Sequence, residues 1–317
     1  MPASPLLAPL ARLAAATLLL TGAAAAQGVP PDIATQLKEM GRVIDPPKVG
    51  AIYGRLQQQE PFPGIRIERD IKYGSAERHR LDVFTPETVG GGPRPVLIFV
   101  HGGGFVAGDK HTPGTPFNDN VAAWAAKNGF IGVNLTYRLA PQAPWPAGAE
   151  DVCAAVRWVG DNIGSRGGDG ARVYLMGHSA GAVHVASYVS HPEFHGPKGV
   201  GLAGAILVSG LYDLTALSFS KFELAYFGDD AATYAQRSSL AGLVGGKLPL
   251  LVMMAELDPP PFEQQYKLLT EQLCKSERGC ARTAVLADHS HISEVYAINT
   301  SDISLTSQIV AFTASGK

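Results

Sequence analysis

Short apolar runs alternate with helix-like segments along most of this chain. The runs cover residues 95–100, 131–137, 173–176, 205–209, 248–255 and 281–286. The helix-like segments cover residues 121–128, 150–163, 183–189, 262–273 and 304–313. An uninterrupted apolar run suits a strand that is buried on both faces, and a helix is the usual connection between two parallel strands. The pattern therefore predicts an α/β fold with a mostly parallel central sheet and helices on both faces.

The chain before residue 95 follows a different pattern. Two strand-like runs, 65–73 and 81–84, flank a polar turn and alternate partly between apolar and polar residues, which suits an antiparallel pair at a sheet edge. With the later runs they predict a sheet of about eight strands. Upstream we expect two short helices, 32–40 and 48–58, with the prolines of Asp45-Pro46-Pro47 stopping the first. Residues 27–60 should form a small helical cap over the site.

The first 26 residues have the pattern of a secretory signal peptide. Arg12 is followed by an apolar run, 13–26, and the small residues Ala24 and Ala26 precede Gln27. The alternative, a membrane span, fits less well because the run is short and rich in alanine. We therefore expect removal after Ala26 and a periplasmic or secreted protein. Residues 27–317 show no break in composition and are long enough to form one domain with a buried core.

The charge of the chain favours a small-molecule partner. Its formal net charge is −2 and it contains no block of like charges, so we expect neither a nucleic acid nor a membrane surface as partner. Gly199, Gly201 and Gly204 match the Gly-x-Gly-x-x-Gly spacing of dinucleotide-binding folds, but they precede a strand instead of leading from one into a helix. We therefore expect no cofactor and no metal, and the sequence leaves the oligomeric state open.

Export would make the three cysteines informative, because an oxidising compartment permits disulfides. Cys274 and Cys280 bracket a short polar loop, where a bridge is expected, although both could stay reduced. Cys153 lies in an apolar helical pattern and is expected to be a buried free thiol. No cysteine spacing matches a zinc site.

A Gly-x-Ser-x-Gly motif lies where one predicted strand turns into a helix. Gly177 and Gly181 surround Ser179, after the apolar run 173–176. Glycine permits a turn too tight for a Cβ, and such a turn holds the serine hydroxyl out into a cleft. The motif occurs by chance in glycine-rich chains, but its position between strand and helix identifies Ser179 as a candidate nucleophile.

A serine nucleophile needs a base, and the base needs a carboxylate to orient it. In a parallel sheet these side chains come from loops at the carboxyl ends of strands. Asp258 follows the run 248–255 and is the preferred acid, although Asp213 also follows a strand and Asp258 could instead be a helix N-cap. His291 is preferred to His289 as the base because it lies nearer the following helical segment. A metal bound by this His-x-His pair is less well supported, since no further cluster of ligands accompanies it.

Glycines also follow the first parallel strand, in the segment His101-Gly102-Gly103-Gly104-Phe105. Acyl transfer requires donors for the oxyanion of the tetrahedral intermediate, and glycine N–H groups supply them where side chains would obstruct approach. The segment lies upstream of Ser179 at a carboxyl strand end, where an oxyanion loop is expected. A flexible glycine turn is the alternative.

Together these motifs resemble the α/β-hydrolase fold, in its serine esterase branch related to hormone-sensitive lipase. The resemblance rests on His101-Gly102-Gly103-Gly104, Tyr137-Arg138-Leu139-Ala140-Pro141, Gly177-His178-Ser179-Ala180-Gly181, Asp258 and His291. Ser209-Gly210-Leu211-Tyr212-Asp213 and the His-x-His-x-Ser ending are more similar to feruloyl-esterase-like and kynurenine-formamidase-like members.

This resemblance implies roles for individual residues. The N–H groups of Gly103, Gly104 and Ala180 would form the oxyanion hole, and Glu256 would be an auxiliary acid. One departure is His178, where relatives of hormone-sensitive lipase usually carry Asp. A second is the segment 226–240, in which Ser-Ser-Leu replaces the more usual Ser-Pro-Leu. Both departures bear on which subfamily the chain resembles. Neither changes the expected reaction, which is hydrolysis.

The sequence thus predicts a serine carboxylic-ester hydrolase with a small-molecule ester substrate. Ser179, Asp258 and His291 would carry hydrolysis through an acyl-enzyme, on small esters of aromatic or short-acyl type. The alternatives are an amidase of the arylformamidase type, which could use the same residues, and a non-catalytic binding protein on a hydrolase fold. Five aromatic residues are candidate pocket walls: Phe62, Phe105, Trp145, Phe219 and Tyr226.

Overall fold

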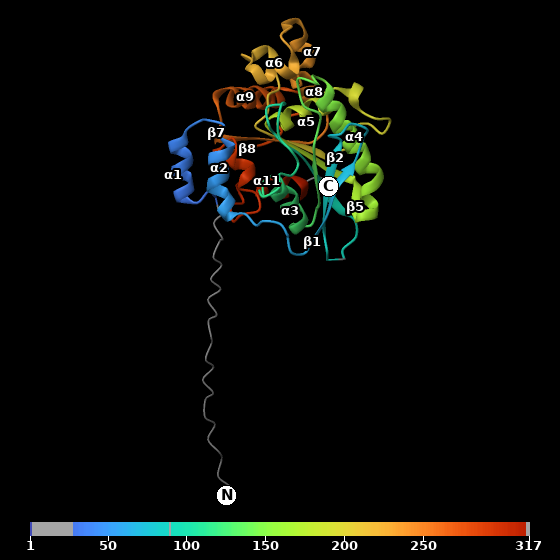
Figure 1. Cartoon of the computed structure of the whole chain (residues 1–317), viewed down its shortest axis with the longest axis vertical. Coiled ribbons are helices and arrows are strands. Elements are labelled where there is room, and N and C mark those ends of the chain that lie inside the picture. The colour runs from blue at the N-terminus through green and yellow to red at the C-terminus, as the bar shows by residue number, and fades with distance from the viewer. Residues whose placement is uncertain (2–27, 89, 315–317) are drawn as a thin grey trace.

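The computed structural model describes residues 1, 28–88 and 90–314 (Figure 1). Apart from Met1, the predicted signal peptide lies outside the described residues. Within the described ranges, no helix has the length and apolar character that crossing a membrane requires.

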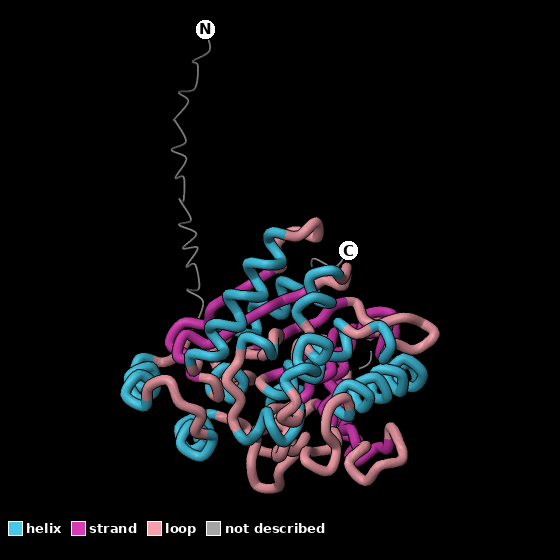
Figure 2. The backbone as a smooth tube through the Cα atoms, turned by 90° about the horizontal axis from the view of Figure 1, so that it is seen from above, coloured by secondary structure: helices cyan, strands magenta, loops and turns pink. Residues whose placement is uncertain are grey.

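One eight-stranded sheet organises the described chain, in the strand order β1-β2-β4-β3-β5-β6-β7-β8 (Figures 1 and 2). Strands β3 to β8 run parallel to one another, while β1 pairs antiparallel with β2 and β2 antiparallel with β4. The strand bounds are Ile65–Lys72, Arg80–Pro86, Arg94–Val100, Ile131–Leu135, Gly168–His178, Gly204–Val208, Leu250–Leu257 and Arg282–Ser290. This confirms the predicted α/β-hydrolase sheet, including its antiparallel edge.

Burial explains why the apolar runs were recognisable as strands. Every residue of β4 and β6 is buried, as are the last five residues of β3. Helices cover both faces of the sheet, as Figure 2 shows. One core cluster packs the sheet against α4 (Ala147–Asn162), α5 (Ala180–Ser190) and α9 (Pro260–Lys275). A second cluster packs the opposite face against α3 (Asp119–Lys127) and α11 (Ser304–Ala314).

Two N-terminal helices, α1 (Pro31–Met40) and α2 (Pro46–Tyr53), lie beside the carboxyl end of the sheet. Their apolar side chains form a cluster with Ile292 and Ala297, next to the end of β8. The prolines act differently from the prediction. Helix α1 ends at Met40 with Gly41 as its C-cap, and Pro46 and Pro47 begin α2, where a missing N–H costs no hydrogen bond. Asp45 caps α2 by accepting a hydrogen bond of 3.1 Å from the Lys48 N–H.

The chain between β6 and β7 contains short helices that the sequence patterns did not predict. They are α6 (Lys221–Phe227), α7 (Tyr234–Arg237) and α8 (Leu240–Gly245). A fourth short helix, α10 (Ser293–Tyr296), follows β8. Five 3-10 turns complete the described structure: Gly54–Leu56, Ile163–Arg166, Pro192–Phe194, Leu214–Ala216 and Ala231–Thr233. Helices of four to seven residues are too short for a recognisable 3.6-residue period.

The cysteines have the predicted states. Cys274 and Cys280 form a disulfide between the end of α9 and the start of β8, and Cys153 is a buried free thiol. Burial raises the pKa of the Cys153 thiol, which keeps it protonated and unreactive.

Candidate active site

Ser179 lies at a sharp turn between β5 and α5. Its φ of 55° is unusual for a residue with a side chain, and its N–H donates to the carbonyl of Val208 at 3.0 Å. The turn fits only because its neighbours lack side chains. A Cβ on Gly177 would overlap the backbone of Gly181, and a Cβ on Gly181 would overlap the backbone of Val100. The strained serine is therefore held by the packing of the surrounding strands.

His291 is the first residue after β8, and its ring nitrogen Nδ1 donates to Oδ1 of Asp258 at 2.7 Å. Asp258 follows the end of β7 and is fully buried. Its other oxygen, Oδ2, accepts from Ser209 Oγ at 2.6 Å and from the Ala255 N–H at 3.0 Å. These contacts fix the carboxylate and assign the proton of His291 to Nδ1. The opposite nitrogen, Nε2, has no hydrogen-bond partner among the described residues, and the ring lines the same cavity as Ser179.

The alternative residues lie elsewhere. His289 is inside β8, with Nδ1 3.0 Å from Ser293 Oγ and Nε2 3.1 Å from Asp302 Oδ2. Asp213 accepts a hydrogen bond of 2.9 Å from the Thr215 N–H and so caps a 3-10 turn. Glu256, the expected auxiliary acid, accepts from the N–H of Asp288 at 2.7 Å and does not line the cavity. The structure therefore brings Asp258 and His291 together. His289, Asp213 and Glu256 instead make hydrogen bonds or ion pairs away from the cavity.

The glycine segment after β3 lies directly against Ser179. A Cβ on Gly102 would lie 3.1 Å from the Cβ of Ser179. Gly103 and Gly104 have φ values of 126° and 58°, which side chains disfavour. Across the described chain, no backbone hydrogen bond engages the N–H of Gly103, Gly104 or Ala180. Ala180 is the first residue of α5, where the backbone N–H groups lack partners within the helix.

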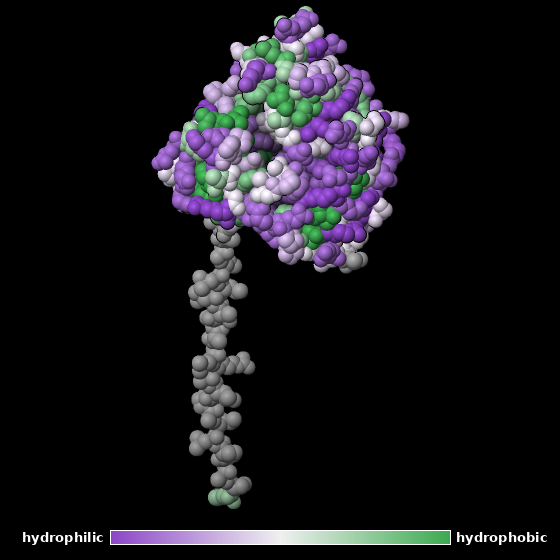
Figure 3. Space-filling view, in the orientation of Figure 1, coloured by the Kyte–Doolittle hydropathy of each residue, from purple (hydrophilic) through white to green (hydrophobic). Residues whose placement is uncertain are grey.

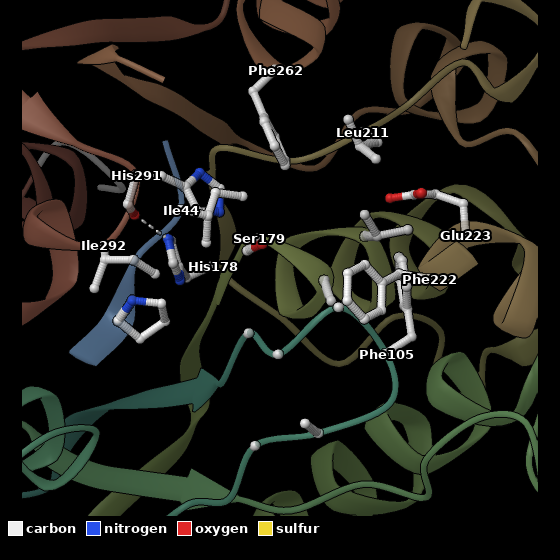
Figure 4. Close-up of a pocket in the computed structure, with 18 of the residues that line it drawn as sticks. Ile44, Phe105, His178, Ser179, Leu211, Phe222, Glu223, Phe262, His291 and Ile292 are labelled. Carbon is white, nitrogen blue, oxygen red and sulfur yellow. Dashed lines mark hydrogen bonds between the residues drawn. The ribbon is translucent and has the colours of Figure 1, made fainter. Parts of the chain in front are cut away.

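Ser179, His291 and the glycine segment share a cavity of about 680 Å³ (Figure 4). Figure 3 shows a hollow on this face of the molecule, between apolar areas. One side is lined by Ile44 and Pro46, from the start of α2, and another by residues of α6 and the chain before it. The cavity is mostly apolar, as small-molecule sites usually are, and its size suits a small organic ligand.

The same architecture occurs in solved esterases. Esterase B from Lactobacillus rhamnosis, whose structure includes a tributyrin phosphonate inhibitor, is 19% identical and has a TM-score of 0.69, covering 89% of this chain and 94% of that one. A hyperthermophilic esterase from the archaeon Pyrobaculum calidifontis is 22% identical, with a TM-score of 0.63 and coverage of 92% and 97%. The chain therefore has the α/β-hydrolase fold of these esterases.

Comparison with sequence families and curated proteins finds partial matches. Residues 81–193 match the BD-FAE family. Carboxylesterase NlhH of Mycobacterium tuberculosis is 40% identical over 124 residues, which are 38% of this chain and 37% of that protein. Esterase LipI of the same species is 44% identical over 133 residues, 41% of this chain and 40% of that protein. These two matches span less than half of the relatives' length. The residues that match the BD-FAE family include Ser179 and the glycine segment.

Of the five predicted pocket walls, only Phe105 is among the described residues that line the cavity. Phe62 packs on Phe84, and Trp145 lies against His191 and Phe194. Phe219 and Tyr226 pack in the cluster behind Phe105. These four predictions were wrong because aromatic residues fill cores more often than they line sites.

The cavity walls that the sequence analysis missed come mainly from loops and short helices. They include Ile44, Leu211, Leu217, Phe222, Phe262 and Tyr296. Their positions depend on how the N-terminal segment and α6 pack over the sheet. Residue patterns near the motifs carry no signal for that packing.

His178, between Gly177 and Ser179, joins two parts of the site. Its Nε2 donates to the backbone carbonyl of His291 at 2.7 Å and lies 3.1 Å from Glu294 Oε1. Burial, with the nearby His291, lowers the pKa of His178 well below its usual value. Burial and the Asp258 carboxylate raise the pKa of Glu294 well above its usual value. Both shifts favour the neutral side chains and so disfavour a second charge beside Asp258.

Two groups of described residues bring potential metal ligands together, within 4.8 Å of one another: His178, His291 and Glu294, and separately Glu60, His111 and Asp119. In the first group the histidines already bond to a carbonyl and to Asp258. In the second, Arg69 donates to both oxygens of Asp119. These contacts assign both groups to hydrogen-bond and ion-pair networks.

Proposed function

We propose that this α/β-hydrolase is a serine carboxylic-ester hydrolase that acts through an acyl-enzyme on small esters of aromatic or short-acyl type. The observation that carries the proposal is the arrangement of His291. Its Nδ1 is held by Asp258 at 2.7 Å, while its unpartnered Nε2 belongs to a ring that lines the cavity with Ser179. This is the arrangement that a general base needs in order to take a proton from a serine.

The proposed reaction begins with Ser179 Oγ attacking the ester carbonyl while His291 Nε2 accepts the hydroxyl proton. Asp258 stabilises the imidazolium that forms. The N–H groups of Gly103, Gly104 and Ala180 would bind the oxyanion. His291 then gives the proton to the departing alcohol, which leaves the acyl group on Ser179. Water, activated by the same histidine, releases the acid and restores the serine.

The curated relatives support ester hydrolysis as the reaction. Beside the two mycobacterial esterases, a protein from Pseudarthrobacter oxydans named phenmedipham hydrolase is 35% identical over 119 residues, 35% of this chain and 23% of that protein. An amidase of the arylformamidase type is the second candidate, because the same three side chains would serve an amide. A non-catalytic role is disfavoured, since the nucleophile, the base and the glycine segment border one cavity and the buried acid is hydrogen-bonded to the base.

One experiment tests the proposal. We expect a fluorophosphonate probe to label the wild type and not Ser179→Ala, because only an activated serine reacts with it. The same two proteins are assayed with an aryl ester and the matching aryl amide, and we expect the wild type to turn over the ester faster. Labelling or ester turnover that persists in Ser179→Ala would reject Ser179 as the nucleophile. Faster amide turnover would favour the amidase.

The proposed location is the periplasm or the medium. The sequence pattern of residues 1–26 supports export, and the bridge between Cys274 and Cys280 is of a kind that persists in oxidising compartments. Fractionation of cells expressing the whole chain, with N-terminal sequencing of the product, tests this. Recovery in the cytoplasm with Met1 retained would contradict it.

A further inference from the structure

Among the described residues that line the cavity, Glu223 supplies the one carboxylate. Glu223 lies in the first turn of α6, and its side chain points toward the cavity in Figure 4. One oxygen, Oε2, accepts hydrogen bonds from the N–H and Oγ of Ser220, which closes a capping box. Within the described ranges, no hydrogen bond or ion pair engages the other oxygen, Oε1. Half of the carboxylate is therefore available to a ligand.

The remaining charges around the cavity do not neutralise Glu223. Among its described lining residues, the other ionisable groups are His178, His291 and Tyr296, and there is no lysine or arginine. Behind His291 lies the buried Asp258, a second acidic group. The nearest cation along the chain is Lys221, whose Nζ lies 5.1 Å from the Phe222 ring centroid, and Lys221 is exposed and outside the lining. Glu223 therefore has no cationic side chain beside it among the described lining residues.

Aromatic rings complete the surroundings. Phe105, Phe222, Phe262 and Tyr296 line the cavity with Glu223. Phe222 packs on the glycine segment, since a Cβ on Gly104 would lie 3.3 Å from its ring. Ring faces attract cations, most strongly quaternary ammonium groups, and they do not attract anions. A carboxylate with a free oxygen in a cavity that is also lined by aromatic rings is a combination that can bind an ammonium group.

We propose that Glu223 forms a subsite for a cationic group, so that the cavity selects esters that carry an ammonium group over neutral esters and excludes esters that carry a carboxylate. This inference rests on the proposed ester hydrolysis. The cation lies between Oε1 of Glu223 and the rings, while the ester carbonyl reaches Ser179. An anionic substrate meets the unneutralised Glu223 and binds poorly.

The test uses esters that differ only in one terminal group. In one series the acyl chain of a 4-nitrophenyl ester ends in trimethylammonium, tert-butyl or carboxylate, the first two having nearly the same shape. In a second series the same groups end the alcohol of a butanoate ester, which is followed by proton release. The wild type is compared with Glu223→Gln, in which the amide oxygen still accepts from Ser220 and keeps the capping box. Glu193→Gln, an exposed acid outside the cavity, is the matched control.

The wild type should favour the trimethylammonium ester over its tert-butyl counterpart in kcat/KM in at least one series. Glu223→Gln should reduce this preference by about tenfold and raise the relative rate of the carboxylate ester, since one charge is removed at short range. The preference should weaken with added salt and stay unchanged in Glu193→Gln. Equal preferences in the wild type and Glu223→Gln in both series would overturn the subsite. If the tert-butyl esters are not cleaved in a Ser179-dependent way, the proposed function fails instead.

Discussion

His178 shows how one residue can depart from a family pattern and still serve the site. Its ring links the end of β5 to the carbonyl of His291 at 2.7 Å, so the nucleophile turn and the base loop share a contact. The histidine also lies beside the buried Glu294. The departure thus has a structural explanation that the sequence alone could not supply, because residues 178 and 291 are far apart in the chain.

The two histidines at the end of β8 have different surroundings, and this difference leads to a prediction. We expect His291→Ala to lower kcat by about 10³-fold or more, because it removes the base that Asp258 holds. His289→Ala should change kcat by less than about tenfold and should mainly lower the melting temperature, because His289 contacts Ser293 and Asp302. Steady-state kinetics and thermal unfolding of both variants check this. A larger loss of kcat in His289→Ala would make the assignment wrong.

At the scale of elements, most of the fold and part of the site could be predicted. Buried strands and the helices between them leave a periodic apolar signal, and the acid and base follow strand ends in a parallel sheet. Strand β8 continues to Ser290, four residues beyond the predicted end at 286, because polar residues such as Asp288 carry no strand signal.

The cavity walls depend on how α6 and the N-terminal segment pack against parts of the chain that are distant in sequence. The capping box of Ser220 and Glu223 was a sequence signal for α6.

The segment between α1 and α2 is attached to the acid loop by Arg42. Its Nε donates to the backbone carbonyl of Asp258 at 2.5 Å, and its Nη2 lies 2.6 Å from Glu263 Oε2 on α9. Ile44, two residues further along, lines the cavity. Arg42 therefore ties the segment that contains Ile44 to the loop that contains Asp258, and Ile44 and Pro46 line one side of the cavity.

We expect Arg42→Ala to raise KM about three- to tenfold and to lower kcat less, because the wall that contains Ile44 loses its anchor. Arg55→Ala is the matched control, since Arg55 pairs with Asp32 at 3.4 Å in the same N-terminal region and lies outside the cavity lining. Kinetics with a short and a long acyl ester measure both constants. An equal rise in KM in the two variants would show that Arg42 has no special connection to the site.

At the scale of the whole molecule, the core carries histidines in an unusual environment. His101 and His184 are buried, and burial lowers the pKa of His101 to about 4 and that of His184 to about 3. His184 lies among the rings of Phe105, Tyr137 and Tyr226, and neither of its ring nitrogens has a hydrogen-bond partner among the described residues. These side chains fold in their neutral form, so the fold itself is sensitive to acid.

The pH dependence of stability follows from these shifts. Below about pH 6.5 the unfolded chain binds protons at His101 and His184, while the folded chain does not until about pH 4 and pH 3. The unfolded state then holds more protons, so the free energy of unfolding falls as the pH falls, by up to about 1.4 kcal/mol per pH unit for each histidine. We expect His184→Leu to reduce the slope of the unfolding free energy against pH by the contribution of one histidine, up to about 1.4 kcal/mol per pH unit. The altered packing changes the free energy of unfolding at pH 8 but not this difference in slope. Denaturant unfolding at several values between pH 8 and pH 4.5 measures the slope, and a slope equal to that of the wild type would contradict the assignment of His184 as a neutral core residue.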